Sequence, residues 1–222
     1  MNPILVAILA AIPAYVLGSL NGALIASKCI YRKDIRQYGS RNPGLTNFHR
    51  VFGIRGALLV VAIDMLKTII PVIFGGWLFA HFTDMALSEV WLFNFAFPVS
   101  LFGQAFAGFF VMVGHCFPLF YHFKGGKAVM TAGTILLVLD WRLALISWGL
   151  FIVITIITRY VSLGAIIGVA AFPISMRIFG LGSYPEFTMA VLCALLLIAR
   201  HHGNIGRLLK GEESKISFKR KK

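Results

Sequence analysis

Residues 39–47 (GSRNPGLTN) combine the residue types that bind a phosphate group. Glycine and proline allow tight turns that leave backbone N–H groups uncovered. Converging N–H dipoles, hydroxyl groups and guanidinium groups hold an anion well. The candidate ligands in and beside this segment are Ser40, Asn42, Gly44, Thr46, Asn47 and Arg50. The segment therefore predicts a phosphate site, although a turn with arginines placed only for membrane topology has the same composition.

A second polar segment, residues 114–127, ends in Lys-Gly-Gly-Lys. Flexible backbone amides between two cations, ahead of a helix N-terminus, resemble a phosphate cradle. The spacing is not that of a Walker A loop, and a basic turn has the same residues. His115 in this segment fits three roles: a general base, a hydrogen-bond donor to phosphate, or a packed side chain. The candidates here are His115, Lys124, Gly125, Gly126 and Lys127.

Two more polar clusters follow near the C-terminal end of the chain. Ser162 comes just after Arg159 and Tyr160. His201 and Asn204 are three residues apart, so on a continuing helix they face one partner. Glu213 cannot usefully approach a phosphate, and we expect it to orient a cation. The three cysteines have neither metal nor disulfide spacing, so we expect no metal and no cofactor.

The composition predicts that membrane-spanning helices position these clusters. Of 222 residues 59% are hydrophobic, above the roughly half that is usual for soluble domains, and the mean hydropathy is +0.84. The formal net charge is +13, and the basic residues responsible for it lie between the apolar runs and in the tail. Membrane topology therefore explains the charge better than nucleic-acid binding does. We expect a single polytopic membrane domain over residues 1–222, with residues 210–222 as a basic cytoplasmic tail.

The apolar runs predict an all-α protein with about seven transmembrane helices. Residues 3–27 are too long for a signal peptide, and no basic residue precedes them. The fourth run is shorter than the roughly 20 residues that cross a bilayer, and Pro173 is expected to break the sixth. The expected spans are 3–27, 56–80, 91–113, 128–139, 143–158, 161–179 and 186–200.

Basic residues set the expected orientation of these spans. Of the 21 lysines and arginines, only Lys67, Arg142 and Arg177 lie away from one membrane side. The positive-inside rule makes that side cytoplasmic. The N-terminus and the loop at 81–90 are then outside, and the C-terminus and all the polar clusters are cytoplasmic. A carrier would have polar residues through the whole membrane depth, so we expect an enzyme or receptor site that opens to the cytosol.

The second expected span contains two ionisable residues, Asp64 and Lys67, on one helix face. Charged groups at this depth normally face the helix bundle in pairs or line a wet cavity. Either an internal ion pair that orients the helix or a wall of the site fits the pattern.

Taken together, these motifs resemble the signatures of the bacterial acyl-phosphate-dependent glycerol-3-phosphate acyltransferases, the PlsY family. The matching segments are GSRNPGLTN, GHCFPLF with FKGGK, and the terminal His-x-x-Asn with Gly-Glu-Glu. Their order and spacing agree over nearly the whole chain, and Asp64-x-x-Lys67 and the segment around Ser162 are also similar to that family. Two departures are Ala128, where a glycine is usual, and Leu45, where alanine is usual.

The resemblance implies transfer of a fatty acyl group from acyl-phosphate to the sn-1 hydroxyl of glycerol 3-phosphate. The products would be lysophosphatidic acid and inorganic phosphate, in the first step of membrane phospholipid synthesis. A substrate phosphate, rather than a side chain, would take the hydroxyl proton. The expected location is the bacterial inner membrane, among membrane lipids, with an upstream acyl-phosphate-forming enzyme and no nucleic-acid partner.

The resemblance also suggests roles for the candidate residues. Ser40, Asn42, Thr46 and Ser162 would surround one phosphate. Arg50, Lys124, Lys127 and Asn204 would face the anions, with His115 and His201 as hydrogen-bond partners. The H-x-x-x-x-D motif of soluble acyltransferases is absent from the sequence. A transporter of an anionic phosphate-bearing metabolite, or a non-catalytic protein whose basic loops bind lipid headgroups, remains an alternative.

Overall fold

The computed structural model describes residues 1–83, 87–92 and 95–216, with side chains described outside residues 84–99. Two antiparallel strands, β1 (Leu87–Leu92) and β2 (Phe95–Ser100), form a hairpin. Every other described element is helical. These are α1 (Pro3–Gly18), α2 (Gly22–Cys29), η1 (Ile35–Gln37), α3 (Leu45–Phe82), α4 (Leu101–Cys116), η2 (Leu119–Tyr121), α5 (Val129–Leu139), α6 (Trp141–Thr158), α7 (Val161–Ile178), α8 (Tyr184–Arg200) and α9 (His202–Leu209).

The described helices form an integral membrane protein. Five segments are long and apolar enough to cross a bilayer, and α8 with α9, bent by 59°, makes a sixth. A seventh span would have to be α5, which has only 11 residues. Such a helix is about 16 Å long, roughly half of a hydrocarbon core. The expected membrane class is confirmed, and the expected seven spans stay a prediction.

Several expected boundaries are wrong. The first span, Pro3–Cys29, agrees with the expected 3–27, but its helix is interrupted at residues 19–21, between α1 and α2. The third begins at Leu101 instead of residue 91, because the hairpin precedes it. Pro173 does not break α7, since neighbouring groups in a membrane bundle tolerate a proline. Residues 28–55, between the first two expected spans, are partly helical, because α3 starts at Leu45 and bends at Gly53. The part of the 81–90 loop around residue 84 lies outside the described residues.

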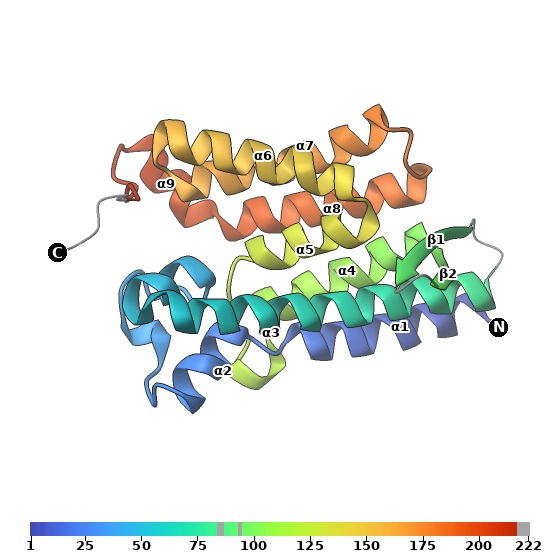
Figure 1. Ribbon diagram of the computed structural model, residues 1–222, viewed down its shortest axis with the longest axis horizontal. Helices are drawn as coiled ribbons and strands as arrows, with labels where there is room; N and C mark the ends of the chain where they lie inside the picture. Colours follow the sequence, from blue (N-terminus) through green and yellow to red (C-terminus); the bar gives the residue numbers. More distant parts are fainter. Residues whose placement is uncertain (84–86, 93–94, 217–222) are drawn as a thin grey trace.

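The helices pack in two layers (Figure 1). One layer contains α1, α3 and α4, which pack on one another. The other contains α6, α7 and α8, and α5 lies between the layers in contact with α3, α4 and α6. The N-terminus and the hairpin lie at one end of the molecule, whereas α2 and α9 lie at the opposite end. The polar segments of the sequence therefore gather at the end that holds α2 and α9.

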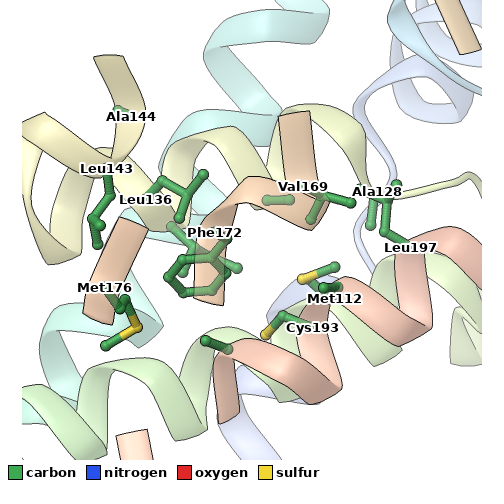
Figure 2. Close-up of a cluster of buried hydrophobic side chains, with 14 of the residues drawn as sticks. Met112, Ala128, Leu136, Leu143, Ala144, Val169, Phe172, Met176, Cys193 and Leu197 are labelled. Atoms are coloured by element: carbon green, nitrogen blue, oxygen red, sulfur yellow. The ribbon is translucent and has the colours of Figure 1, made fainter. Parts of the chain in front are cut away.

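Buried apolar side chains join the two layers (Figure 2). Met112 of α4, Leu136 of α5, Phe172 of α7 and Cys193 of α8 belong to one cluster, and each is at most 2% exposed. Large apolar side chains on the outer faces of α1, α3 and α6 are exposed instead. An apolar surface of this kind is unfavourable in contact with water, but it is suited to contact with lipid chains. Among them are Ile4, Ile12, Leu58, Leu66, Ile70, Ile156 and Ile157.

Candidate active site

One cavity of about 450 Å³ collects most of the predicted site residues. It lies between the start of α3, the loop before α5, the start of α7, and α8 with α9. The sequence candidates that line it are Ser40, Asn42, Gly44, Thr46, Asn47, Arg50, His115, Lys127, Ser162, His201, Asn204 and Glu213. Lys124, Gly125 and Gly126 lie outside the lining. Four segments that are far apart in the sequence therefore meet at one place, although their roles remain predictions.

At this cavity the N-termini of α3, α5 and α7 have no side-chain cap among the described residues. The first turns of α3, α5 and α7 line it, and none has a capping hydrogen bond from a side chain. By contrast, Asn2, Asn21, Ser100 and Asp140 cap α1, α2, α4 and α6. The first N–H groups of a helix need an acceptor, and an anion is the best one. The uncapped ends therefore offer a phosphate three sets of donors.

The cations of the cavity exceed its carboxylates. Lys127 Nζ donates a hydrogen bond to Asn204 Oδ1 and pairs with no carboxylate among the described residues. Arg50 likewise has no carboxylate partner there. Burial and the neighbouring Arg207 and Arg200 lower the pKa of Lys127. The Lys127 ammonium group is therefore disfavoured until an anion joins it, which suits a phosphate ligand.

Glu213 lies at the centre of a hydrogen-bond network. Its Oε1 accepts bonds from Ser162 Oγ (2.7 Å) and Asn204 Nδ2 (2.6 Å), and its Oε2 accepts one from Arg207 Nε (2.7 Å). Burial acts to raise the pKa of Glu213, but these bonds together hold it below its ordinary value. Glu213 is thus ionised and orients an arginine, as the sequence suggested. The backbone of Ile216 pairs with that of Arg159, which fixes this C-terminal segment beside α7.

Asn47 stabilises the first polar segment from within. Its Oδ1 accepts a bond from Ser40 N (2.8 Å), and its Nδ2 donates to Tyr38 O (3.0 Å). Gly39 has φ +58°, a conformation that favours glycine. Asn21 Nδ2 donates to Pro43 O (3.1 Å), which ties the segment to the break between α1 and α2. Asn47 thus shapes the loop with the two polar atoms that could otherwise bind a ligand.

The Lys-Gly-Gly-Lys segment is not an open cradle. Gly126 N donates to His115 O (3.1 Å), and Arg200 donates to the carbonyls of Gly125 and Gly126. Lys124 is exposed. A Cβ atom at Gly126 would lie 2.4 Å from His115 Nε2, and one at Gly125 would lie 2.1 Å from His115 O. The two glycines therefore leave room for the histidine, and the amide of Gly126 is already engaged within the chain.

The deeper part of the cavity is apolar. Met130 and Gly133 of α5 line it together with Trp148, Phe151 and Ile152 of α6. Trp148 and Ile152 also reach the outer surface, where they are 38% and 51% exposed. The polar end of the cavity thus continues into an apolar end that borders the lipid. A ligand with a phosphate head and a hydrocarbon chain matches both ends.

The sequence did not single out several residues of this region. Arg207 lines the cavity, and Arg200 holds the glycine loop while its guanidinium lies 5.0 Å from the centre of the Phe117 ring. Both arginines follow the last long apolar run, where positive charge also serves topology. Trp148 and Phe151 are hidden among many aromatic residues. Only the packing of α5 on α6 identifies those two as cavity walls.

Comparison with known proteins assigns this architecture to a family. The sequence profile described as Glycerol-3-phosphate acyltransferase matches residues 8–211. A glycerol-3-phosphate acyltransferase of Herminiimonas arsenicoxydans is 37% identical over 222 residues, which cover 100% of both chains. One of Thermoanaerobacter pseudethanolicus is 36% identical over 213 residues, 96% of this chain and 97% of its own. The chain belongs to the glycerol-3-phosphate acyltransferase family.

Solved structures of the family share the fold. The integral membrane glycerol 3-phosphate acyltransferase PlsY (YgiH), in its glycerol 3-phosphate form, superposes with a TM-score of 0.80 at 30% identity. That match covers 95% of this chain and 96% of PlsY. The lysophosphatidic acid form of PlsY gives a TM-score of 0.78 at 29% identity, covering 95% of each chain. The resemblance inferred from the sequence motifs is confirmed.

Proposed function

We propose that this protein transfers a fatty acyl group from acyl-phosphate to the sn-1 hydroxyl of glycerol 3-phosphate. The bond between the acyl carbon and the phosphate oxygen breaks, and an ester bond to the glycerol oxygen forms. The hydroxyl proton passes to a phosphate oxygen, so the products are lysophosphatidic acid and inorganic phosphate. Acyl-phosphate is an activated mixed anhydride. The tasks left to the protein are positioning and charge neutralisation.

The two-part cavity is the observation that carries this proposal. Its polar end holds the uncapped N-termini of α3, α5 and α7, and there Arg50 and Lys127 have no carboxylate partner among the described residues. Its apolar end, at Trp148 and Ile152, borders the lipid. Both substrates are anions and one is a lipid, so one cavity with these two ends suits both. The forms in which PlsY was solved, with glycerol 3-phosphate and with lysophosphatidic acid, support the same chemistry.

Within this cavity we assign the polar residues by their positions. Ser40, Asn42, Thr46 and Ser162 surround one phosphate, next to the free N–H groups of α3 and α7. Arg50, Lys127 and Asn204 face the anions, with His115 and His201 as hydrogen-bond partners. His201 Nδ1 lies 2.8 Å from Leu197 O, and a carbonyl only accepts, so Nδ1 carries the proton there.

We place the polar end of the molecule at the cytoplasmic face of the bacterial inner membrane. The basic residues gather there, and the N-terminus and hairpin lie at the opposite end. Acyl-phosphate, made by an upstream enzyme, would enter from the inner leaflet, and glycerol 3-phosphate from the cytosol. The N-terminus is then outside and the C-terminus inside.

The direct test incubates purified protein with acyl-phosphate and labelled glycerol 3-phosphate, with acyl-CoA in parallel. We expect equal amounts of lysophosphatidic acid and phosphate from acyl-phosphate, and no product from acyl-CoA. Equal turnover with acyl-CoA would refute the proposed donor. Uptake of glycerol 3-phosphate into proteoliposomes without a new chemical species would instead support a transporter.

A further inference from the structure

Lys67 is enclosed by three hydrogen-bond acceptors. Its Nζ lies 2.9 Å from Asp64 Oδ1, 2.7 Å from Leu20 O and 2.8 Å from His115 Nδ1. Both charged side chains of the ion pair are 2% exposed. Leu20 O is available because the backbone between α1 and α2 is unwound, and Gly22 N of the same break donates to Asp64 Oδ1 (3.1 Å).

This geometry determines the proton position on His115. Lys67 beside a carboxylate is an ammonium group, which has three N–H donors and no acceptor. Each donor meets one of the three acceptors, so His115 Nδ1 must be unprotonated and the neutral ring carries its proton on Nε2. Nε2 has no hydrogen-bond partner within the described residues, and His115 lines the cavity.

We infer that Lys67 and Asp64 are positioning residues that fix the tautomer of His115 and present its Nε2–H to the substrates as a hydrogen-bond donor. This inference rests on the proposed function for the identity of the acceptor, a phosphate or acyl carbonyl oxygen. Nε2 already holds a proton, and the lone pair of Nδ1 is used by Lys67. The ring therefore offers no free site to the proton of the glycerol hydroxyl, in keeping with the proton acceptor named in the proposed function.

The first test needs no substrate and so separates this inference from the proposed function. Nitrogen NMR of ¹⁵N-histidine-labelled protein in lipid reports the protonation of each ring nitrogen, and loss of a signal in His115→Gln assigns it. We expect a neutral ring protonated at Nε2. A ring protonated at Nδ1, or at both nitrogens at neutral pH, would overturn the inference.

The second test uses side chains that imitate one ring nitrogen each. The amide of His115→Gln reaches the position of Nε2, whereas that of His115→Asn reaches Nδ1. Loss of one donor to a developing charge costs about 100-fold in kcat, so we expect about that loss in His115→Leu and His115→Asn. His115→Gln should stay within about tenfold of the parent, in keeping with a retained donor. If His115→Gln falls as far as His115→Leu, the donor role is refuted.

The third test asks whether the ion pair acts through the histidine. The double variant Asp64→Asn/Lys67→Met removes both charges without leaving one unpaired. We expect this double variant to lower kcat about tenfold in the otherwise unchanged protein and to have almost no effect when His115→Gln is already present. The reason is that the effects of substitutions at coupled residues do not add. Equal losses in both backgrounds would show a merely structural pair. Arg142→Met, which breaks the Asp140–Arg142 ion pair outside the cavity lining, is the matched control.

Discussion

Replacement of Lys127 by methionine tests how the cavity holds an anion. The side chain is partly buried, and its ammonium group bonds Asn204 but no carboxylate in the part of the chain that the structure describes. A bound phosphate would supply the missing charge. Loss of one charge-assisted hydrogen bond costs about 1.5–3 kcal/mol, which corresponds to roughly tenfold to over a hundredfold in rate. We therefore expect Lys127→Met to lose most of its activity while it remains folded.

Lys124→Met is the informative comparison, because the sequence alone predicts the same role for both lysines. Lys124 is exposed and outside the cavity lining, so its removal should change the rate by less than about threefold, as for surface charges. The assay is kcat/KM for lysophosphatidic acid formation, measured separately for each substrate, with thermal unfolding as the check on folding. Similar losses in the two variants would refute the reasoning from the cavity and restore the cradle hypothesis.

Three further predictions concern pH, packing and orientation. Because the pKa of Lys127 is lowered, kcat/KM should fall at alkaline pH as the Lys127 ammonium loses its proton. Lys127→Arg should shift that fall to higher pH, and a pH–rate profile that is unchanged in this variant would contradict the prediction. Gly126→Ala should abolish most activity, since its methyl group would collide with the neighbouring imidazole, whereas Gly206→Ala meets nothing within 4 Å and should be active. In intact cells, the exposed Cys29 should not react with a membrane-impermeant maleimide. A cysteine introduced by Tyr184→Cys, in a protein that also carries Cys29→Ser, should react. The opposite labelling pattern would show that the orientation in the membrane is inverted.

Composition and motif order were enough to predict the membrane class, the family and many of the residues that line the cavity. Clustered charge, apolar runs and short polar motifs are local properties, so a sequence displays them directly. Twelve of the candidates line one cavity for that reason. The sequence predicted only that Ser162 and Glu213 lie on the same side of the membrane. The structure adds a direct hydrogen bond between their side chains.

Features that depend on distant partners could not be predicted in this way. The break at residues 19–21 lies inside an apolar run, and distant side chains bond the backbone there: Lys67 at Leu20 O, and Asp64 at Gly22 N just after it. The alternatives for this pair, an internal ion pair or a site wall, prove compatible, since Asp64 also lines the cavity. The role of Gly126 was assigned to its amide, whereas the space it leaves for the imidazole is a tertiary property.

The central claim is that one cavity holds both the phosphate and the acyl chain of a lipid. A structure of this protein with lysophosphatidic acid bound would test it most directly. We predict the phosphate within hydrogen-bond distance of Lys127 and of the first turns of α3 and α7, with the chain along Trp148 and Phe151 between α5 and α6. A phosphate away from those helix ends, or a chain on the outer face of α1 or α3, would contradict the account.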